Sequence, residues 1–163
     1  MKAIFYLVAL LCTGALFGFF FTMSFSIMPG LDLTAPFSAI LANQEIGHAT
    51  QKSYFAVALI GTPVSLAILF DSLWRSGLKV EQRWVAVAFV AFVAMMVVTL
   101  TLNVPLNQIL DVLPISADQE NLNALWLAYS VDWQKWNLLR VLFSGVSLLA
   151  LGGALLKHNA RGA

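Results

Sequence analysis

The chain has 163 residues, of which 60% are hydrophobic and only 10% are charged. Soluble domains carry about 25% charged residues, so this chain has too little polar surface to face water on all sides, and lipid is the solvent that its composition requires. The net charge of +1 gives no sign of a nucleic-acid partner, which would need a concentrated basic patch. A single cysteine excludes a disulfide within the chain.

Charged residues divide the chain into apolar stretches of membrane length. The stretches without Asp, Glu, Lys or Arg are 3–31, 53–70, 84–110 and 141–156. A helix needs roughly 20 apolar residues at about 1.5 Å each to cross the hydrocarbon. We therefore predict an all-α fold, a four-transmembrane-helix bundle with helical outer loops, forming a single membrane domain over residues 1–163 with spans near 4–28, 53–71, 84–104 and 136–156.

The first span begins like a secretory signal, with Lys2 ahead of an apolar run. A signal's apolar region covers only about 7–15 residues, and this run is longer, so we expect a retained helix. Gly14 and Gly18 form a GxxxG pattern, which favours close helix packing either within the bundle or in a homo-oligomer. The sequence Met28-Pro29-Gly30 indicates a turn at the end of the span.

Pro36 suits the first position of a helix in the first outer loop, and residues 37–51 continue a helical pattern that can run straight into the second span. That span carries Gly61-Thr62-Pro63, where we expect a kink. Proline disfavours helix at the residue before it, so the third span should end or bend near Val104. In the second outer loop, Ser116-Ala117-Asp118-Gln119 has the form of a capping box and predicts a new helix.

The basic residues predict the orientation. They gather before the first span, between the second and third spans, and after the fourth, whereas most acids lie in the other two loops. The positive-inside rule then places both termini in the cytoplasm of a multi-pass protein of the cell (inner) membrane. The residues on the predicted inner side are Lys2, Arg75, Lys79, Arg83, Lys157 and Arg161.

One face of the last helix gathers aromatic and polar residues. At 100° per residue around the helix axis, six aromatic and polar residues fall within an arc of roughly 100°. An interfacial aromatic belt with a snorkelling arginine explains such a face, and so does a pocket. The final uncharged stretch, 141–156, is too short to cross the membrane alone, so Arg140 should lie about one turn inside the membrane edge. A cation there must face the bundle, pair with an acid such as Glu45 or an outer Asp, or line a wet cavity. The set is Trp126, Tyr129, Trp133, Trp136, Asn137 and Arg140.

Two further clusters are candidates for the same outward-facing pocket. Asn103 and Asn107 either cap the end of the third span or donate hydrogen bonds into the pocket. Glu45 and His48 have the i, i+3 spacing of di-iron bundles, but only one such motif is present, and we predict no metal site. His48 is either a general base or a solvated loop residue.

Known signatures of nucleotide, zinc-protease and serine-hydrolase sites are missing from the sequence. The first three spans also carry no Asp, Glu, Lys or Arg, which a proton-coupled exporter would need. These observations argue against hydrolysis and transport.

Four segments in order carry a family resemblance: Met28-Pro29-Gly30-Leu31, Gln44-Glu45-Ile46, residues 103–107 (NVPLN) and residues 133–140 (WQKWNLLR). This order resembles the anthrone oxygenase-like integral membrane proteins over nearly the whole chain. The resemblance implies oxidation of anthrones to anthraquinones by molecular oxygen, with no recognised organic cofactor. It also implies that Asn103, Asn107, Trp133, Asn137 and Arg140 are functional positions.

An anthrone has an acidic C–H conjugated with a carbonyl, and its enolate reacts with oxygen directly. Such a site needs a base, donors for the enolate oxygen and a flat aromatic cavity. The alternative is a non-catalytic membrane module that binds a lipid or stabilises a membrane protein complex. We assign His48, Glu45, Arg140 and Asn137 to catalysis, and Asn103, Asn107, Trp126, Tyr129, Trp133 and Trp136 to binding of a small apolar aromatic ligand.

Overall fold

A computed structural model describes residues 2–113 and 119–161, and all regular structure in these residues is helical. Four helical stretches are long and apolar enough to cross a membrane: Lys2–Asp32, Phe55–Arg75, Lys79–Asp111 and Asn121–Asn159. The predicted all-α, four-span fold is therefore confirmed. The α-helices are α1 (Lys2–Thr22), α2 (Met28–Asp32), α3 (Pro36–Lys52), α4 (Phe55–Arg75), α5 (Lys79–Val98), α6 (Val104–Asp111) and α7 (Gln119–Asn159), and the π-helical turns are η1 (Met23–Ile27) and η2 (Thr99–Asn103).

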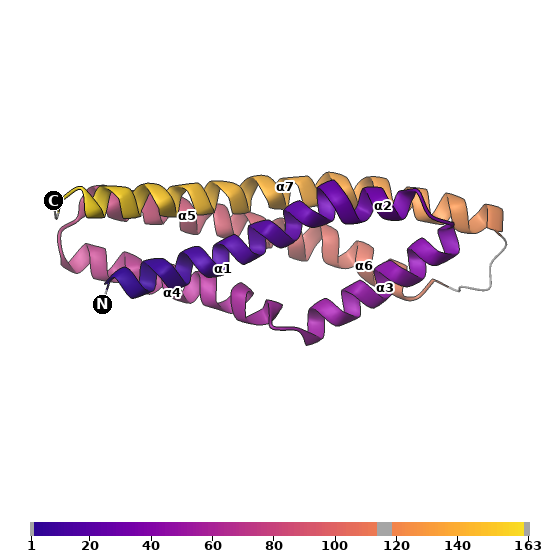
Figure 1. Cartoon of the computed structure of the whole chain (residues 1–163), viewed down its shortest axis with the longest axis horizontal. Helices are drawn as coiled ribbons and strands as arrows, with labels where there is room; N and C mark the ends of the chain where they lie inside the picture. The colour runs from indigo at the N-terminus through magenta and orange to yellow at the C-terminus, as the bar shows by residue number, and fades with distance from the viewer. Residues whose placement is uncertain (1, 114–118, 162–163) are drawn as a thin grey trace.

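Helices α1, α4, α5 and α7 form an elongated bundle, and both chain ends lie at one end of it (Figure 1). The other end is built by α2, α3, α6 and the first part of α7. We call the end with the termini the inner end and the opposite end the outer end. Helix α7 has 41 residues, a length of about 60 Å, which exceeds the hydrocarbon thickness of about 30 Å. Its first turns therefore extend past the other spans.

Each of the two π-helical turns comes just before a proline. Pro29 follows η1 and Pro105 follows η2, in both cases two residues after the turn ends. Proline lacks an N–H and its ring collides with the carbonyl four residues earlier. In both helices that carbonyl lies within the π turn, whose wider geometry moves it aside. The helix therefore passes through Pro29, where the sequence indicated a turn, and it also continues beyond Val104, while α6 leaves the line of α5 toward α3 (Figure 1).

Helices α3 and α4 are separate, contrary to the expectation that they run together. Ser53 is extended, with φ −89° and ψ 173°. Its hydroxyl donates to the carbonyl of Thr50 at 2.8 Å and accepts from the N–H of Phe55 at 3.1 Å. One serine therefore ends α3 and starts α4, and the chain turns a corner there (Figure 1). Pro36 begins α3 as predicted, whereas the expected capping box at Ser116 lies outside the described residues.

The inner half of the bundle is a packed apolar core. Two glycines allow close approach to α1: a Cβ on Gly61 would lie 2.8 Å from the sulfur of Cys12, and one on Gly145 would lie 3.3 Å from the ring of Phe17. The Ser147 hydroxyl donates to the carbonyl of Ala88 at 2.9 Å and joins α7 to α5. The largest fully buried side chains of this core are Tyr6, Leu16, Leu66, Leu69, Leu73, Met95 and Leu151.

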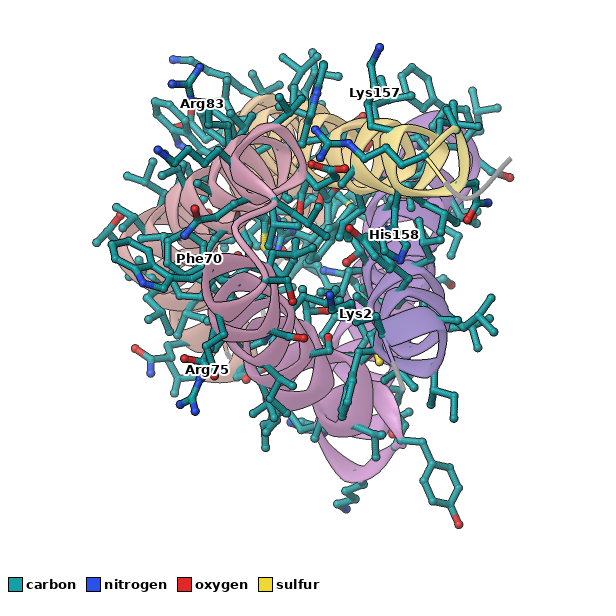
Figure 2. The ribbon with its side chains drawn as sticks, turned by 90° about the vertical axis from the view of Figure 1, so that its left-hand side faces the viewer. Lys2, Phe70, Arg75, Arg83, Lys157 and His158 are labelled. Carbon is teal, nitrogen blue, oxygen red and sulfur yellow. The ribbon has the colours of Figure 1, made fainter. Side chains whose placement is uncertain are left out.

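The inner end also carries basic side chains and a tight turn. Figure 2 shows Lys2, Arg75, Arg83 and Lys157 around this end of the helices. Gly77 joins α4 to α5 with φ +66°, a conformation that costs glycine little. The basic residues that predicted the orientation thus share one end of the molecule.

Candidate functional site

Arg140 lies inside the bundle, at the middle of α7, with only 5% of its surface exposed. Its guanidinium lies between two aromatic rings, 4.5 Å from the ring centre of Phe20 and 4.9 Å from that of Trp133. Cation–π attraction to both rings stabilises the charge without using the N–H groups. Within the described residues, Nε and Nη2 of Arg140 are buried and have no hydrogen-bond partner.

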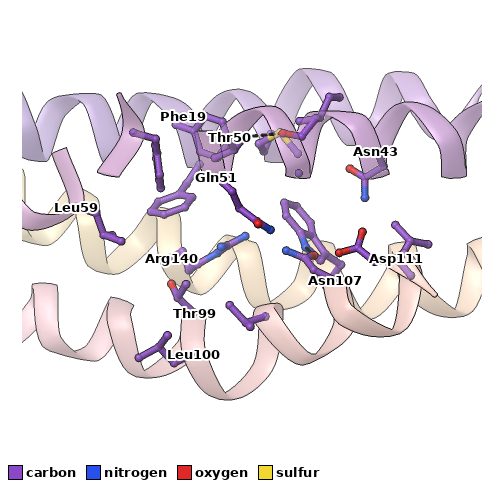
Figure 3. A pocket seen from close by; sticks show the side chains of 18 of the residues that line it. Phe19, Asn43, Thr50, Gln51, Leu59, Thr99, Leu100, Asn107, Asp111 and Arg140 are labelled. Carbon is purple, nitrogen blue, oxygen red and sulfur yellow. Dashed lines mark hydrogen bonds between the residues drawn. The ribbon is translucent and has the colours of Figure 1, made fainter. Parts of the chain in front are cut away.

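A cavity of about 350 Å³ lies next to this guanidinium. Figure 3 shows Arg140 reaching into it from α7, with Gln51 on the opposite wall and Asn107 and Asp111 toward its outer end. Phe19, Phe55, Leu59 and Met96 give its inner part an apolar surface. The remaining lining residues are Phe20, Met23, Asn43, Ile46, Gly47, Thr50, Ala56, Thr99, Leu100, Val104, Leu110, Tyr129 and Trp133.

A hydrogen-bonded chain forms the outer wall of the cavity. The amide of Asn43 donates to the Tyr129 hydroxyl at 2.7 Å, and that hydroxyl donates to Oδ1 of Asn107 at 3.0 Å. Trp133 Nε1 donates to the same oxygen at 2.7 Å. Because both donors hold Asn107 Oδ1, they fix the carboxamide and also orient the Trp133 ring that covers Arg140. Asn107, Tyr129, Trp133 and Arg140 are thus the sequence-predicted residues that line the cavity.

The other two predicted carboxamides hold helices together and do not line the cavity. Asn137 Nδ2 donates to the carbonyl of Phe20 at 2.9 Å and to the hydroxyl of Ser24 at 2.6 Å. Asn103 Nδ2 donates to the carbonyl of Trp133 at 3.2 Å. The bonds to Phe20 and Trp133 fix the two residues whose rings contact the Arg140 guanidinium, so these side chains position the walls of the site.

Two predicted tryptophans lie away from the cavity. Trp126 Nε1 donates to Asp32 Oδ1 at 2.9 Å, and Ser130 Oγ donates to the same oxygen at 2.6 Å. This carboxylate therefore fastens the end of α2 to α7. Trp136 is only partly buried, and Lys135 Nζ lies 4.5 Å from its ring centre. That arrangement is typical of an interfacial tryptophan.

Glu45 and His48 are exposed on the surface of α3 and do not line the cavity. His48 Nε2 lies 3.8 Å from Asp111 Oδ1, and Asp111 does line it. An acid, Glu45 or an outer Asp, was a candidate partner of Arg140, but the ion pairs in the described part of the chain leave Arg140 out, and Asp118 lies outside the described residues. Aromatic rings surround the cation instead.

Sequence reasoning missed Asp111 and Phe20. Asp111 lies four residues after Asn107, on the same side of a helix, so helical spacing was a signal that would have found it. Phe20 is one of many phenylalanines in its span and carries no comparable signal. Among the described residues, no group of three or more His, Cys, Asp or Glu side chains is placed to hold a metal ion.

These features define a class: a four-span membrane helix bundle whose outer half encloses a cavity beside a buried cation that has no ion-pair partner in the described part of the chain. A family model described as anthrone oxygenase matches residues 46–150, which include α4, α5, α6 and the cavity-lining part of α7. The chain therefore belongs to the anthrone oxygenase family. Comparisons with curated proteins and with solved structures found no match.

Proposed function

We propose that this protein binds a small aromatic carbonyl compound in the cavity and oxidises it with molecular oxygen. One observation carries the proposal: the buried guanidinium of Arg140 faces a cavity with two nitrogens that have no partner among the described residues. A cation in the membrane interior is costly unless it serves a site. An anionic oxygen on a ligand supplies the missing partner.

The first role of Arg140 is to stabilise negative charge on that oxygen. When a C–H conjugated with a carbonyl loses its proton, the charge moves to the carbonyl oxygen. Charge-assisted hydrogen bonds from a guanidinium are strong in a site that excludes water, and they strengthen as the charge develops. Phe20 and Trp133 hold the guanidinium plane in place, so the donors need no reorganisation.

The reaction also needs a group that removes the proton, and the residues at the outer end of the cavity supply it. In an anthrone the acidic methylene lies across the central ring from the carbonyl. A carbonyl oxygen at Arg140 then turns the methylene away from the cation, toward the end that holds Asp111. Asp111 takes the proton, and His48, 3.8 Å away, receives it from the carboxyl group and passes it to water. In this proposal His48 keeps the role of base predicted from the sequence, acting through Asp111.

The reaction balances without any further reagent. The enolate carbon gives its electrons to oxygen and forms a C–O bond, which yields a hydroperoxide once the peroxide oxygen is protonated. Loss of the remaining C–H proton and of hydroxide from the O–O bond then gives a second carbonyl and one water. The methylene is oxidised by four electrons and one molecule of oxygen is reduced.

Turnover of anthrone by the purified protein under oxygen tests the proposal. Arg140→Gln should lower kcat at least about 100-fold, as does removal of a donor to a developing oxyanion. Arg140→Lys keeps the charge but loses the planar donors, and it should retain part of the activity. Asn137→Ala should lower kcat less, because Asn137 acts through Phe20. Unchanged turnover in Arg140→Gln contradicts the proposal.

We also propose that the inner end faces the cytoplasm of the cell (inner) membrane. The basic residues at that end support it under the positive-inside rule. The cavity then opens toward the outer surface. Reaction of single-cysteine variants at Ser76 and Tyr54, in a Cys12→Ala background, with a membrane-impermeant thiol reagent on intact cells is the check. Labelling at position 54 alone is the expected result, and labelling at position 76 alone contradicts the orientation.

A further inference from the structure

We infer that the ligand reaches Arg140 sideways from the outer leaflet of the bilayer, through an apolar opening between α4 and η2. The substrate is therefore a membrane-dissolved aromatic compound with an ionisable oxygen and an alkyl portion that stays in the opening. This inference rests on the proposed binding cavity and adds the route and the class of substrate.

Two apolar residues line the cavity and are exposed on the outside of the bundle. They are Ala56 on α4 and Leu100 on η2, and Leu100 has 59% of its surface exposed. Neighbouring aliphatic residues are also exposed, namely Val57 on α4 at 62% and Val97 near the end of α5 at 53%. In a membrane these side chains contact lipid, so lipid borders the opening.

The depth of this opening matches that of the cation. Leu100 lies about 25 Å along the helix from Arg83, and Arg140 lies about 25 Å from Lys157. Arg83 and Lys157 both lie at the inner end (Figure 2). With a hydrocarbon layer of about 30 Å, Leu100 and Arg140 both lie within the leaflet at the outer end. Figure 3 shows Thr99 and Leu100 on the wall beside Arg140.

The cavity has a second, polar rim at a different place. Gln51 and Asp111 line the cavity and are exposed, Gln51 on the wall opposite Arg140 and Asp111 toward the outer end (Figure 3). These two side chains suit water and protons, not an apolar ring system. The apolar rim therefore admits the organic substrate and oxygen from lipid, and the polar rim exchanges protons with water. An alkyl chain can trail between Ala56 and Leu100 while the ring oxygen contacts the guanidinium.

The experiment measures binding of a product analogue, so it does not depend on turnover. The probes are a decyl-substituted hydroxyanthraquinone, which partitions into lipid, and a hydroxyanthraquinone sulfonate, which stays in water. Quenching of tryptophan fluorescence in nanodiscs reports association, and a Trp133→Phe variant identifies the signal of the cavity. Leu100→Trp closes the apolar rim, Gln51→Trp closes the polar rim, and Val93→Trp adds a tryptophan to a lipid-facing position that does not line the cavity.

Leu100→Trp should slow association of the decyl probe at least about tenfold, which corresponds to about 1.4 kcal/mol of added barrier. Val93→Trp should leave that rate within about twofold of wild type, and Gln51→Trp should slow it less than Leu100→Trp does. If Gln51→Trp slows the decyl probe and Leu100→Trp does not, the ligand comes from water and the inference is overturned while the cavity stands. If neither probe quenches Trp133 in the wild type, the proposed function fails together with the inference.

Discussion

The inner and outer halves of the bundle each bury a charged side chain, and they treat it differently. At the inner end, the fully buried carboxylate of Glu81 has an ion-pair partner, since Arg161 Nε lies 2.9 Å from Oε1, although neither carboxylate oxygen accepts a hydrogen bond within the described residues. In the outer half, the guanidinium of Arg140 has two aromatic rings beside it and a cavity in front of it. A buried charge with a partner holds a structure together, whereas one that faces a cavity is available to a ligand.

The same contrast holds for the neutral residues. The inner half packs aliphatic and aromatic side chains such as Leu16 and Met95, with glycines where helices come closest. The outer half contains both π-helical turns and buries Asn103 and Asn137, which bond to carbonyls of neighbouring helices. The inner half therefore provides the rigid frame, and the outer half provides a cavity with an apolar inner surface and polar groups on its outer wall. We expect substitutions in the outer half to change turnover and those in the inner half to change stability.

After Arg140→Gln, the largest expected effect belongs to Asp111→Asn in the outer half. Loss of the proton acceptor should lower kcat about 100-fold, within the range for removal of a general base. Binding of the decyl probe should change less than about threefold, since the amide keeps the shape of the carboxylate. Steady-state oxygen consumption and the quenching titration check the two parts. A large loss of binding with unchanged kcat would assign Asp111 to recognition instead.

The next effect is expected from Arg161→Gln at the inner end. This substitution leaves the buried Glu81 carboxylate without its cation. Because Arg161 itself is half exposed, the loss of stability should be about 1–2 kcal/mol, below the cost of breaking a fully buried pair. Thermal unfolding in detergent measures it, and Arg161→Gln with Glu81→Gln should recover most of it. Equal kcat in the variant and the wild type is the expected companion result.

Close helix packing in the inner half predicts a smaller effect for Gly61→Ala. The added Cβ would lie 2.8 Å from the Cys12 sulfur, and overpacking of this kind costs about 1 kcal/mol or more. Cys12→Ala should remove most of the penalty in the double variant, as a double-mutant cycle would show. Gly18→Ala is the matched control, because nothing lies within 4 Å of a Cβ there. Additive effects at positions 12 and 61 would argue against this contact.

The smallest effect is expected for Ser147→Ala. Its hydroxyl bonds to the carbonyl of Ala88 between α7 and α5. Hydrogen bonds between membrane helices contribute about 0.6 kcal/mol on average. A shift of that size in detergent unfolding, with unchanged turnover, would place Ser147 in the frame of the bundle. A loss of turnover would show that the two halves are not independent.

The sequence was sufficient for the number of membrane-length helices, because charge is excluded from lipid and the gaps between charged residues therefore mark the apolar stretches. It also predicted that Arg140 must face the bundle, pair with an acid or line a wet cavity, since the final apolar stretch is too short. The break at Ser53 and the two π turns were not predicted, because each depends on local hydrogen bonds that composition does not determine. Phe20 could not be predicted as a neighbour of Arg140, since the rotation of α1 about its own axis decides which of its many phenylalanines faces α7.

The central claim is that the Arg140 guanidinium is free to bind an ionised oxygen of a ligand inside the membrane. The most direct measurement is the visible absorption spectrum of the decyl hydroxyanthraquinone probe, whose phenol changes colour when it ionises, recorded against pH in nanodiscs. With wild-type protein the bound probe should ionise at a lower pH than in empty nanodiscs, and Arg140→Gln should abolish that difference. A probe that binds the wild type yet keeps its neutral spectrum over the same pH range would contradict the claim.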